Sequence, residues 1–132
     1  MSKSEIQMTR CACFIVVLCI AGCGPHIPDD FTVSGLTLDH WLEALRDGRP
    51  ETRARAVRAL SNVGPDVPAV VPALVKSLSD PNPAVRRQAL LALLKFGPEA
   101  HAAIPALTAA QNDPDETVRE LAAKALRKIE GG

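Results

Sequence analysis

Aromatic residues are scarce in this sequence. It has no tyrosine and one tryptophan, and aromatic residues make up 3% of its 132 positions although 47% are hydrophobic. A hydrophobic core must therefore be built from Ala, Leu and Val. Such side chains suit closely packed helices better than sheets, which favour β-branched and aromatic residues. The length allows one domain, and the composition predicts that this domain is all-α.

The chain also lacks a net charge, since 15 basic residues balance 15 acidic ones. Nothing global therefore favours nucleic acid as a partner, and we expect none. The charges are unevenly spread, because residues 11–28 contain no Asp, Glu, Lys or Arg and the chain after Pro28 is rich in them. This break indicates that two different kinds of segment are joined.

Cysteine is absent after residue 23. The four cysteines all lie within 13 residues of one another, at Cys11, Cys13, Cys19 and Cys23. A disulfide framework would spread its cysteines over the domain, and a zinc site would add ligands at defined spacings further along. We therefore expect neither, and interpret the first three cysteines as small apolar residues of a hydrophobic segment.

The apolar run from Cys11 to Ile20 is too short to cross a bilayer, which takes about 20 residues. With Lys3 and Arg10 before it, the run is typical of a signal peptide. Its end, Ile20-Ala21-Gly22-Cys23, resembles the bacterial lipobox. That resemblance implies a signal peptide over residues 1–22, cleavage before Cys23 and lipid on the Cys23 thiol, followed by a short linker that completes the segment 23–36.

Two alternatives to lipidation stay open: an ordinary cleaved signal followed by an unrelated cysteine, and an uncleaved short anchor. The lipoprotein interpretation places the protein in a bacterial cell envelope, anchored to a membrane and facing the periplasm. It leaves open whether the membrane is the inner or the outer one. Several acyl chains would be needed for firm anchoring, because one chain binds a membrane only marginally.

An internal repeat with a period of 33 residues fills the rest of the chain. Gly64-Pro65 recurs as Gly97-Pro98. Three further columns follow the same spacing without gaps: Asp47, Asp80 and Asp113; Arg53, Arg86 and Arg119; Ala56, Ala89 and Ala122. Repeats of this length indicate a solenoid of stacked supersecondary units.

Each unit reads as helix, tight turn, helix. We predict Thr37, Asn82 and Asp115 as helix N-caps, with Pro50 and Pro83 opening second helices. Apolar residues recur at helical spacing on both helices of each unit. The predicted core residues are Leu38, Trp41, Leu42, Leu45, Val71, Leu74, Val75, Leu78, Val85, Ala89, Leu93, Phe96, Val118, Ala122, Ala125, Leu126 and Ile129.

The turn and second helix carry a family pattern: Asp80-Pro81 precedes Val85-Arg86, and Asp113-Pro114 precedes Val118-Arg119. This pattern resembles HEAT repeats, particularly the bacterial HEAT-like type first named in phycobilin lyases, over residues 37–130. The resemblance implies a short right-handed α-solenoid of about three hairpins. It also implies a structural ladder, in which each arginine bridges the carboxylates of its own and a neighbouring turn. The ladder residues are Asp47, Arg53, Asp80, Arg86, Asp113 and Arg119.

Signatures of chemistry are missing: there is no glycine-rich phosphate loop, no nucleophile motif and no metal-binding motif. His40 and His101 each stand without a second ligand nearby in the sequence. We expect no enzyme, no cofactor and no small-molecule substrate. The last unit has Thr108 and Gln111 where the middle unit has Val75 and Leu78, which predicts a polar face on that side of the stack.

The outward positions of the second helices form a basic stripe, which we define by eight residues: Arg55, Arg58, Arg87, Leu91, Lys95, Leu121, Lys124 and Lys128. Gln88 and Glu120 fall on the same face. The stripe is either an ordinary solvated face or a binding site for an acidic, partly apolar partner, such as a protein segment or lipid head groups. The favoured function is a non-catalytic scaffold that binds a protein partner. The alternatives are a chaperone-like or phycobilin-lyase-like role, implied by the resemblance alone, and an assembly subunit that completes its stack against another protein.

Overall fold

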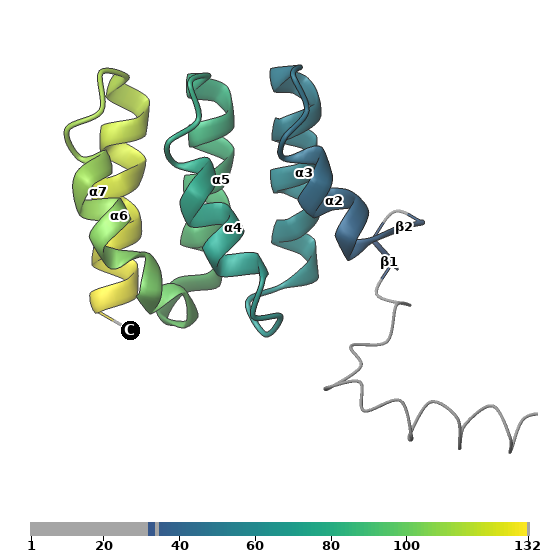
Figure 1. Ribbon diagram of the computed structural model, residues 1–132. Helices are drawn as coiled ribbons and strands as arrows, with labels where there is room; N and C mark the ends of the chain where they lie inside the picture. Colours follow the sequence, from purple (N-terminus) through teal and green to yellow (C-terminus); the bar gives the residue numbers. More distant parts are fainter. Residues whose placement is uncertain (1–31, 34, 132) are drawn as a thin grey trace, which may run out of the picture.

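A computed structural model describes residues 32–33 and 35–131 of the chain. Over this range the chain folds into three helical hairpins that stand side by side in sequence order (Figure 1). The predicted all-α solenoid is thereby confirmed. The predicted signal peptide, residues 1–22, and the predicted lipidation site Cys23 lie outside the described residues.

The first hairpin consists of α2 (Leu38–Ala44) and α3 (Pro50–Val63). The hydroxyl of Thr37 accepts a hydrogen bond from His40 N at 3.4 Å and caps α2, as predicted. Pro50 opens α3, where its missing N–H costs nothing. Both boundaries therefore follow from local sequence.

The second hairpin consists of α4 (Val70–Ser77) and α5 (Pro83–Phe96). The predicted cap of α5 is confirmed, because the side chain of Asn82 accepts a hydrogen bond from Ala84 N at 2.8 Å. Gly97 ends α5 with a φ of +62°, a conformation that glycine adopts at little cost. Gly64 has the corresponding role after α3, with a φ of +102°.

The third hairpin consists of α6 (Ile104–Ala110) and α7 (Glu116–Glu130). The predicted cap Asp115 is confirmed, since its carboxylate accepts a hydrogen bond from Val118 N at 3.0 Å. A 3-10 helix that the sequence analysis did not predict, η1 (Gly97–Ala103), connects α5 to α6. Its Ala100 and Ala103 are fully buried, so this connection is part of the packed structure.

A small β-hairpin precedes the helices. Strand β1 (Thr32–Val33) pairs antiparallel with β2 (Leu36–Thr37), in the register Thr32 to Thr37 and Val33 to Leu36. Gly35, with a φ of +78°, reverses the chain between them. The sequence analysis assigned residues 23–36 to a linker, so its last part is corrected: Leu36 belongs to a paired strand that leads directly into α2.

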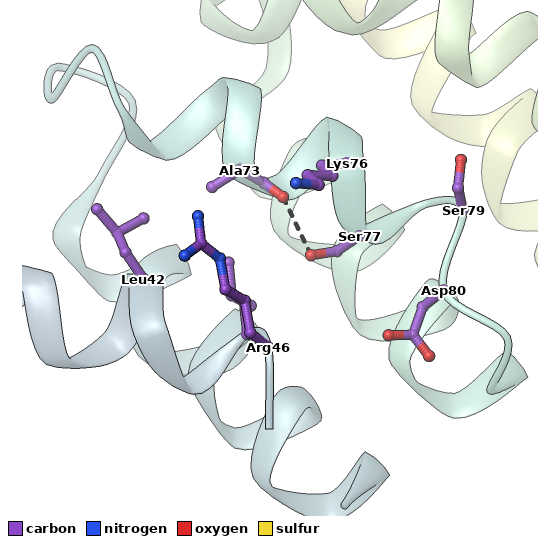
Figure 2. Close-up of a pocket in the computed structure, with 8 residues that line it drawn as sticks. Leu42, Arg46, Ala73, Lys76, Ser77, Ser79 and Asp80 are labelled. Carbon is purple, nitrogen blue, oxygen red and sulfur yellow. Dashed lines mark hydrogen bonds between the residues drawn. The ribbon is translucent and has the colours of Figure 1, made fainter. Parts of the chain in front are cut away.

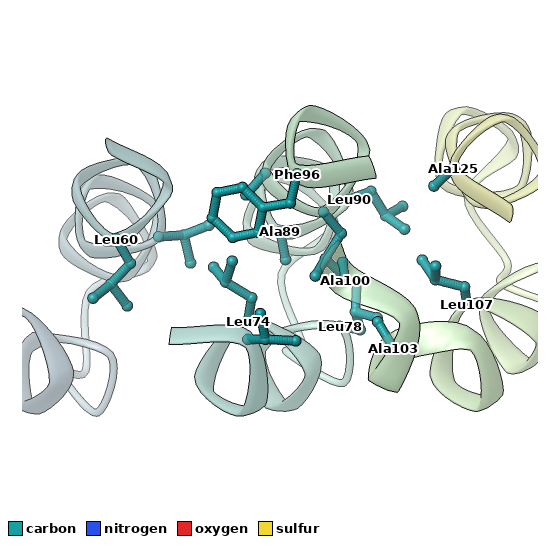
Figure 3. Close-up of a cluster of buried hydrophobic side chains, with 14 of the residues drawn as sticks. Leu60, Leu74, Leu78, Ala89, Leu90, Phe96, Ala100, Ala103, Leu107 and Ala125 are labelled. Carbon is teal, nitrogen blue, oxygen red and sulfur yellow. The ribbon is translucent and has the colours of Figure 1, made fainter. Parts of the chain in front are cut away.

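The core runs continuously through all three hairpins (Figure 3). Leucines fill it at full burial, and each contributes about 1.5–3 kcal/mol relative to an exposed side chain; they are Leu60, Leu74, Leu90, Leu93 and Leu107. Ala56, Ala89 and Ala122 recur at 33-residue spacing, also fully buried, and their small side chains let α3, α5 and α7 approach closely. The predicted core residues are buried except Leu38, Leu42, Leu45 and Val75, which are only half-buried.

Within residues 32–33 and 35–131, no helix is long and apolar enough to cross a membrane.

Candidate protein-binding surface

The second helices α3, α5 and α7 lie next to one another and present one broad face (Figure 1). The basic stripe runs across this face. Six of its eight residues are exposed: Arg55, Arg58, Leu91, Lys95, Lys124 and Lys128. Leu91, at the centre of α5, is 44% exposed and is, with Leu36, one of two exposed large apolar side chains among the residues whose side chains the structure describes. The stripe therefore combines spaced cations with an accessible apolar position.

Two stripe residues differ from the expectation. Arg87 and Leu121 are half-buried rather than outward-facing, and so is Gln88. Arg87 lies on the middle helix α5, which has a neighbour on both sides, and the aliphatic stem of an arginine readily packs along such a surface. Leu121 packs against the core cluster. The accessible part of the stripe is thus narrower than the sequence analysis predicted.

Lys95 links two repeats across the stripe. Its ammonium donates hydrogen bonds to Ser61 O at 3.0 Å and to Asn62 Oδ1 at 3.3 Å. Ser61 and Asn62 lie in the last turn of α3, where the helix dipole favours a nearby positive charge. Lys95 remains exposed, so it can hold this position and still meet a partner.

A hollow of about 320 Å³ marks the α3 end of the stripe, lined by Leu36, Trp41, Arg55, Arg58, Ala59 and Asn62. Two stripe arginines thus border apolar surface that is supplied in part by β2. The sequence analysis missed Leu36 and Asn62 as members of this surface. The signal for Leu36 was its place beside Gly35 in a short apolar–polar alternation, which fits a hairpin strand.

The Asp and Arg columns meet between neighbouring turns. Arg53 binds the carboxylate of Asp80 with two donors, Nε at 2.7 Å and Nη2 at 3.0 Å. One repeat later, Arg86 Nη2 donates to Asp113 Oδ1 at 2.9 Å. Arg86 Nε lies 2.8 Å from Asp113 Oδ2, but its N–H is not aligned for a hydrogen bond. All four side chains are between 10% and 13% exposed, so both pairs are shielded from water.

Within its own turn, each arginine binds a backbone carbonyl and not a carboxylate, which corrects the expected ladder. Arg53 Nη1 donates to Asp47 O at 2.9 Å, and Arg86 Nη1 donates to Asp80 O at 2.8 Å. Arg119 Nη1 donates to Asp113 O, also at 2.8 Å. The carbonyl is the acceptor because the carboxylate of the same aspartate already accepts hydrogen bonds from other residues.

Each ladder aspartate also shapes its own turn. Oδ1 accepts a hydrogen bond from the N–H two residues later: Arg49 N to Asp47 at 2.8 Å, Asn82 N to Asp80 at 2.9 Å, and Asp115 N to Asp113 at 2.8 Å. This is an Asx turn, which aspartate favours. One carboxylate therefore orders the entry to a second helix and receives the arginine of the preceding repeat.

The two ends of the ladder lack a complete pair. Arg119 has no carboxylate partner among the residues that the structure describes, although its two carbonyl contacts match those of Arg86. At the other end, the one cation that forms an ion pair with Asp47 among the described residues is Arg49, at 3.2 Å, and the Arg49 side chain is 77% exposed. Such an exposed pair contributes little.

The ionisation of the first ladder pair reflects these contacts. Burial alone would raise the pKa of the Asp80 carboxyl, but hydrogen bonds from Arg53 and from Asn82 N–H hold this pKa below its usual range. The same hydrogen bond from Arg53 to Asp80 raises the pKa of the Arg53 guanidinium. The backbone N–H of Arg49, helped by its side chain, lowers the pKa of Asp47. These contacts favour the charged forms of Asp47, Arg53 and Asp80, which suits ion pairing and not proton transfer.

The acidic and histidine side chains of the described residues do not gather into a metal site. Within 32–33 and 35–131, no three His, Cys, Asp or Glu side chains come together in a way that could hold a metal ion. His40 is exposed and lies edge-on to Trp41, with ring centroids 5.4 Å apart, and His101 is exposed on η1.

Comparison with known proteins identifies one family. No curated protein matches the sequence. The family model for HEAT repeats matches residues 38–127, which is most of the part that the structure describes. That range begins with α2 and ends in α7, so it covers the three hairpins and the ladder. The chain belongs to the HEAT-repeat family.

Proposed function

We propose that this protein is a non-catalytic scaffold of the bacterial cell envelope that binds a partner protein through its second helices. HEAT repeats typically bind protein partners, which supports the general role. The observation that carries the finer proposal is the exposed part of the basic stripe, where Arg58 on α3 and Lys124 on α7 occupy the positions equivalent to the exposed Leu91 on α5. The matching partner segment is acidic with an apolar residue at its centre.

The geometry of the stripe suits a protein segment. Arg58, Leu91 and Lys124 occupy equivalent positions 33 residues apart on three adjacent helices, so they form a row across α3, α5 and α7. A segment crossing the helices would meet a cation, then an apolar side chain, then a cation. Exposed apolar side chains with a charged rim are typical of interaction sites.

We further propose that lipid on Cys23 holds this scaffold at the membrane. The support is the lipobox-like Ile20-Ala21-Gly22-Cys23 after a short apolar run. An anchor would keep the binding face close to the membrane and confine partner capture to the periplasmic side. Multiple acyl chains would make that attachment stable.

Photo-crosslinking in native envelopes tests the proposal. A photoreactive residue at Leu91 should capture a defined partner, whereas one at the exposed Ala109 of α6 should not. Reversal of three exposed stripe charges, in a triple variant R55E/R58E/K124E, should abolish this crosslink. Raising the salt concentration past about 0.15 M, where the Debye length is about 8 Å, should weaken it.

A charge-matched control separates binding from general electrostatics. The double variant R49E/R127E changes two exposed cations outside the stripe and should leave the Leu91 crosslink intact, whereas the charge-matched R58E/K124E should lose it. If both double variants lose the crosslink equally, the stripe is an ordinary solvated face. Visible absorbance after incubation of the protein with a bilin and its acceptor would favour the phycobilin-lyase-like alternative.

A further inference from the structure

A second surface lies on the first helices, away from the basic stripe. A groove of about 460 Å³ runs between α2 and α4 (Figure 2), and eight residues line it: Leu42, Leu45, Arg46, Ala73, Lys76, Ser77, Ser79 and Asp80. Its floor is apolar, because Leu42, Leu45 and Ala73 are only partly buried against the core.

The repeat explains why apolar surface remains open here. Leu45, Leu78 and Gln111 occupy equivalent positions at 33-residue spacing. Leu78 is only 8% exposed, and Gln111 is exposed and polar, as suits a surface in contact with water. Leu45 is apolar and yet half-covered. Of these three equivalent residues, Leu45 is the one whose apolar side chain is left partly exposed, so a bound partner could bury it further.

The polar groups at the groove floor are already satisfied within the protein. The hydroxyl of Ser77 donates to Ala73 O at 3.0 Å (Figure 2). Asp80 is neutralised by Arg53, which binds its carboxylate at 2.7 Å and 3.0 Å. The groove therefore has no free negative charge of its own among its lining residues.

Two cations line this groove, Arg46 just after α2 and Lys76 on α4 (Figure 2). Arg46 contacts Glu43 at 3.4 Å, but both side chains are more than 70% exposed, so the pair holds Arg46 only weakly. Lys76 forms no ion pair with any residue in the described part of the chain. Two neighbouring positive charges without a shared counter-charge favour an anion between them.

We propose that the groove between α2 and α4 binds an acidic peptide segment of a partner protein. One apolar side chain of the segment packs on Leu42, Leu45 and Ala73. An adjacent carboxylate lies between Arg46 and Lys76. A peptide suits this groove because its polar backbone can stay in water above a short apolar floor. The site is independent of the basic stripe, which lies on α3, α5 and α7.

Selection from a random heptapeptide library on the full-length protein in detergent tests this inference. The Cys23→Ala change keeps lipid out of the assay. The expected peptides combine Leu, Met or Phe with a neighbouring Asp or Glu. Their affinity should fall by about tenfold or more for R46E/K76E, because both counter-charges are reversed. Leu45→Gln, which copies the residue at Gln111, should weaken binding without altering charge.

The matched control is R49E/R127E, which reverses two exposed cations outside both the groove and the basic stripe and should bind the selected peptides as the parent does. Four results would overturn the inference: no enrichment, enrichment of neutral peptides, no loss for R46E/K76E, or an equal loss for R49E/R127E. Competition by a short-chain anionic phospholipid without any peptide enrichment would overturn it in favour of a lipid. Because neither double variant changes a residue of the basic stripe, failure here leaves the test of the basic stripe unaffected.

Discussion

Arg86 and Asp113 join two turns of the solenoid that are 27 residues apart in the chain. Arg86 Nη2 donates to Asp113 Oδ1 at 2.9 Å while Nη1 of the same guanidinium donates to Asp80 O at 2.8 Å. A guanidinium has the planar, multi-donor shape that can serve both turns at once, and a lysine does not. The contact therefore sets the spacing between successive hairpins as well as adding stability.

We expect Arg86→Ala to lower the free energy of unfolding by about 1–3 kcal/mol, because it leaves the shielded Asp113 carboxylate without its cation. Arg55→Ala, on an exposed face of α3, should change it by no more than about 0.5 kcal/mol. Urea unfolding of both variants measures the difference. Equal midpoints would mean that the Arg86 contacts do not stabilise the fold.

Arg119 should matter less than Arg86. It makes the same carbonyl contacts in its own turn, but no carboxylate among the described residues receives its remaining donors. We expect Arg119→Ala to destabilise the protein by at least about 1 kcal/mol less than Arg86→Ala. Thermal unfolding compares the two variants. A double-mutant cycle over Arg86 and Asp113 measures the interaction free energy of that pair, which Arg119 lacks. Equal losses would show that the carbonyl contacts, and not the carboxylate, provide the stability.

Stability should fall in acid through Asp80. The folded-state pKa of Asp80 lies below its usual value, so its contribution is fully present above about pH 4 and disappears as the pH falls through the lowered folded pKa. We expect Asp80→Asn to lower stability at neutral pH and to flatten the loss below pH 4, because the variant has no carboxylate to protonate there. Asp66→Asn, in the exposed loop before α4, should keep the full acid dependence of the parent. Parallel curves for parent and Asp80→Asn would contradict the role of Asp80.

Helix caps differ between the second helices. Asn82 caps α5 with its side chain, whereas Arg49 at the start of α3 makes no capping side-chain hydrogen bond. We expect Asn82→Ala to cost about 1 kcal/mol and Arg49→Asn to stabilise the protein by about 0.5–1 kcal/mol. Differential scanning calorimetry gives both values. A destabilised Arg49→Asn protein would indicate that the exposed Arg49–Asp47 pair is worth more than a cap.

Cys23 should be required for membrane attachment. We expect Cys23→Ala to accumulate as an unprocessed precursor that carries no lipid and leaves the detergent phase on phase partition. The physical reason is that the thiol is the acceptor of the diacylglyceryl group, without which the predicted cleavage does not follow. Metabolic labelling with a radioactive fatty acid measures it, with Cys19→Ala as control. Unchanged labelling of Cys23→Ala would end the lipoprotein proposal.

Local sequence determined the helices and their limits. Asn82, Pro83 and Gly97 define the start and end of α5 by contacts within a few residues, so these boundaries could be predicted without any tertiary information. The 33-residue period likewise identified which side chains are equivalent. Because burial in a solenoid repeats with the repeat, the core positions Ala56, Ala89 and Ala122 followed from that equivalence.

Tertiary structure decided what those equivalent residues contact. The repeat places Arg86 in the same turn as Asp80 but could not show that Asp80 offers its carbonyl and Asp113 its carboxylate, because that choice depends on how one turn is placed against the next. It likewise could not show that Arg87 is half-buried while Arg58 is exposed, since α5 has neighbours on both sides. The groove at Leu45 was likewise decided by tertiary structure. Leu45 is apolar in the sequence, and only the separation of α2 from α4 leaves it half-buried in place of fully buried.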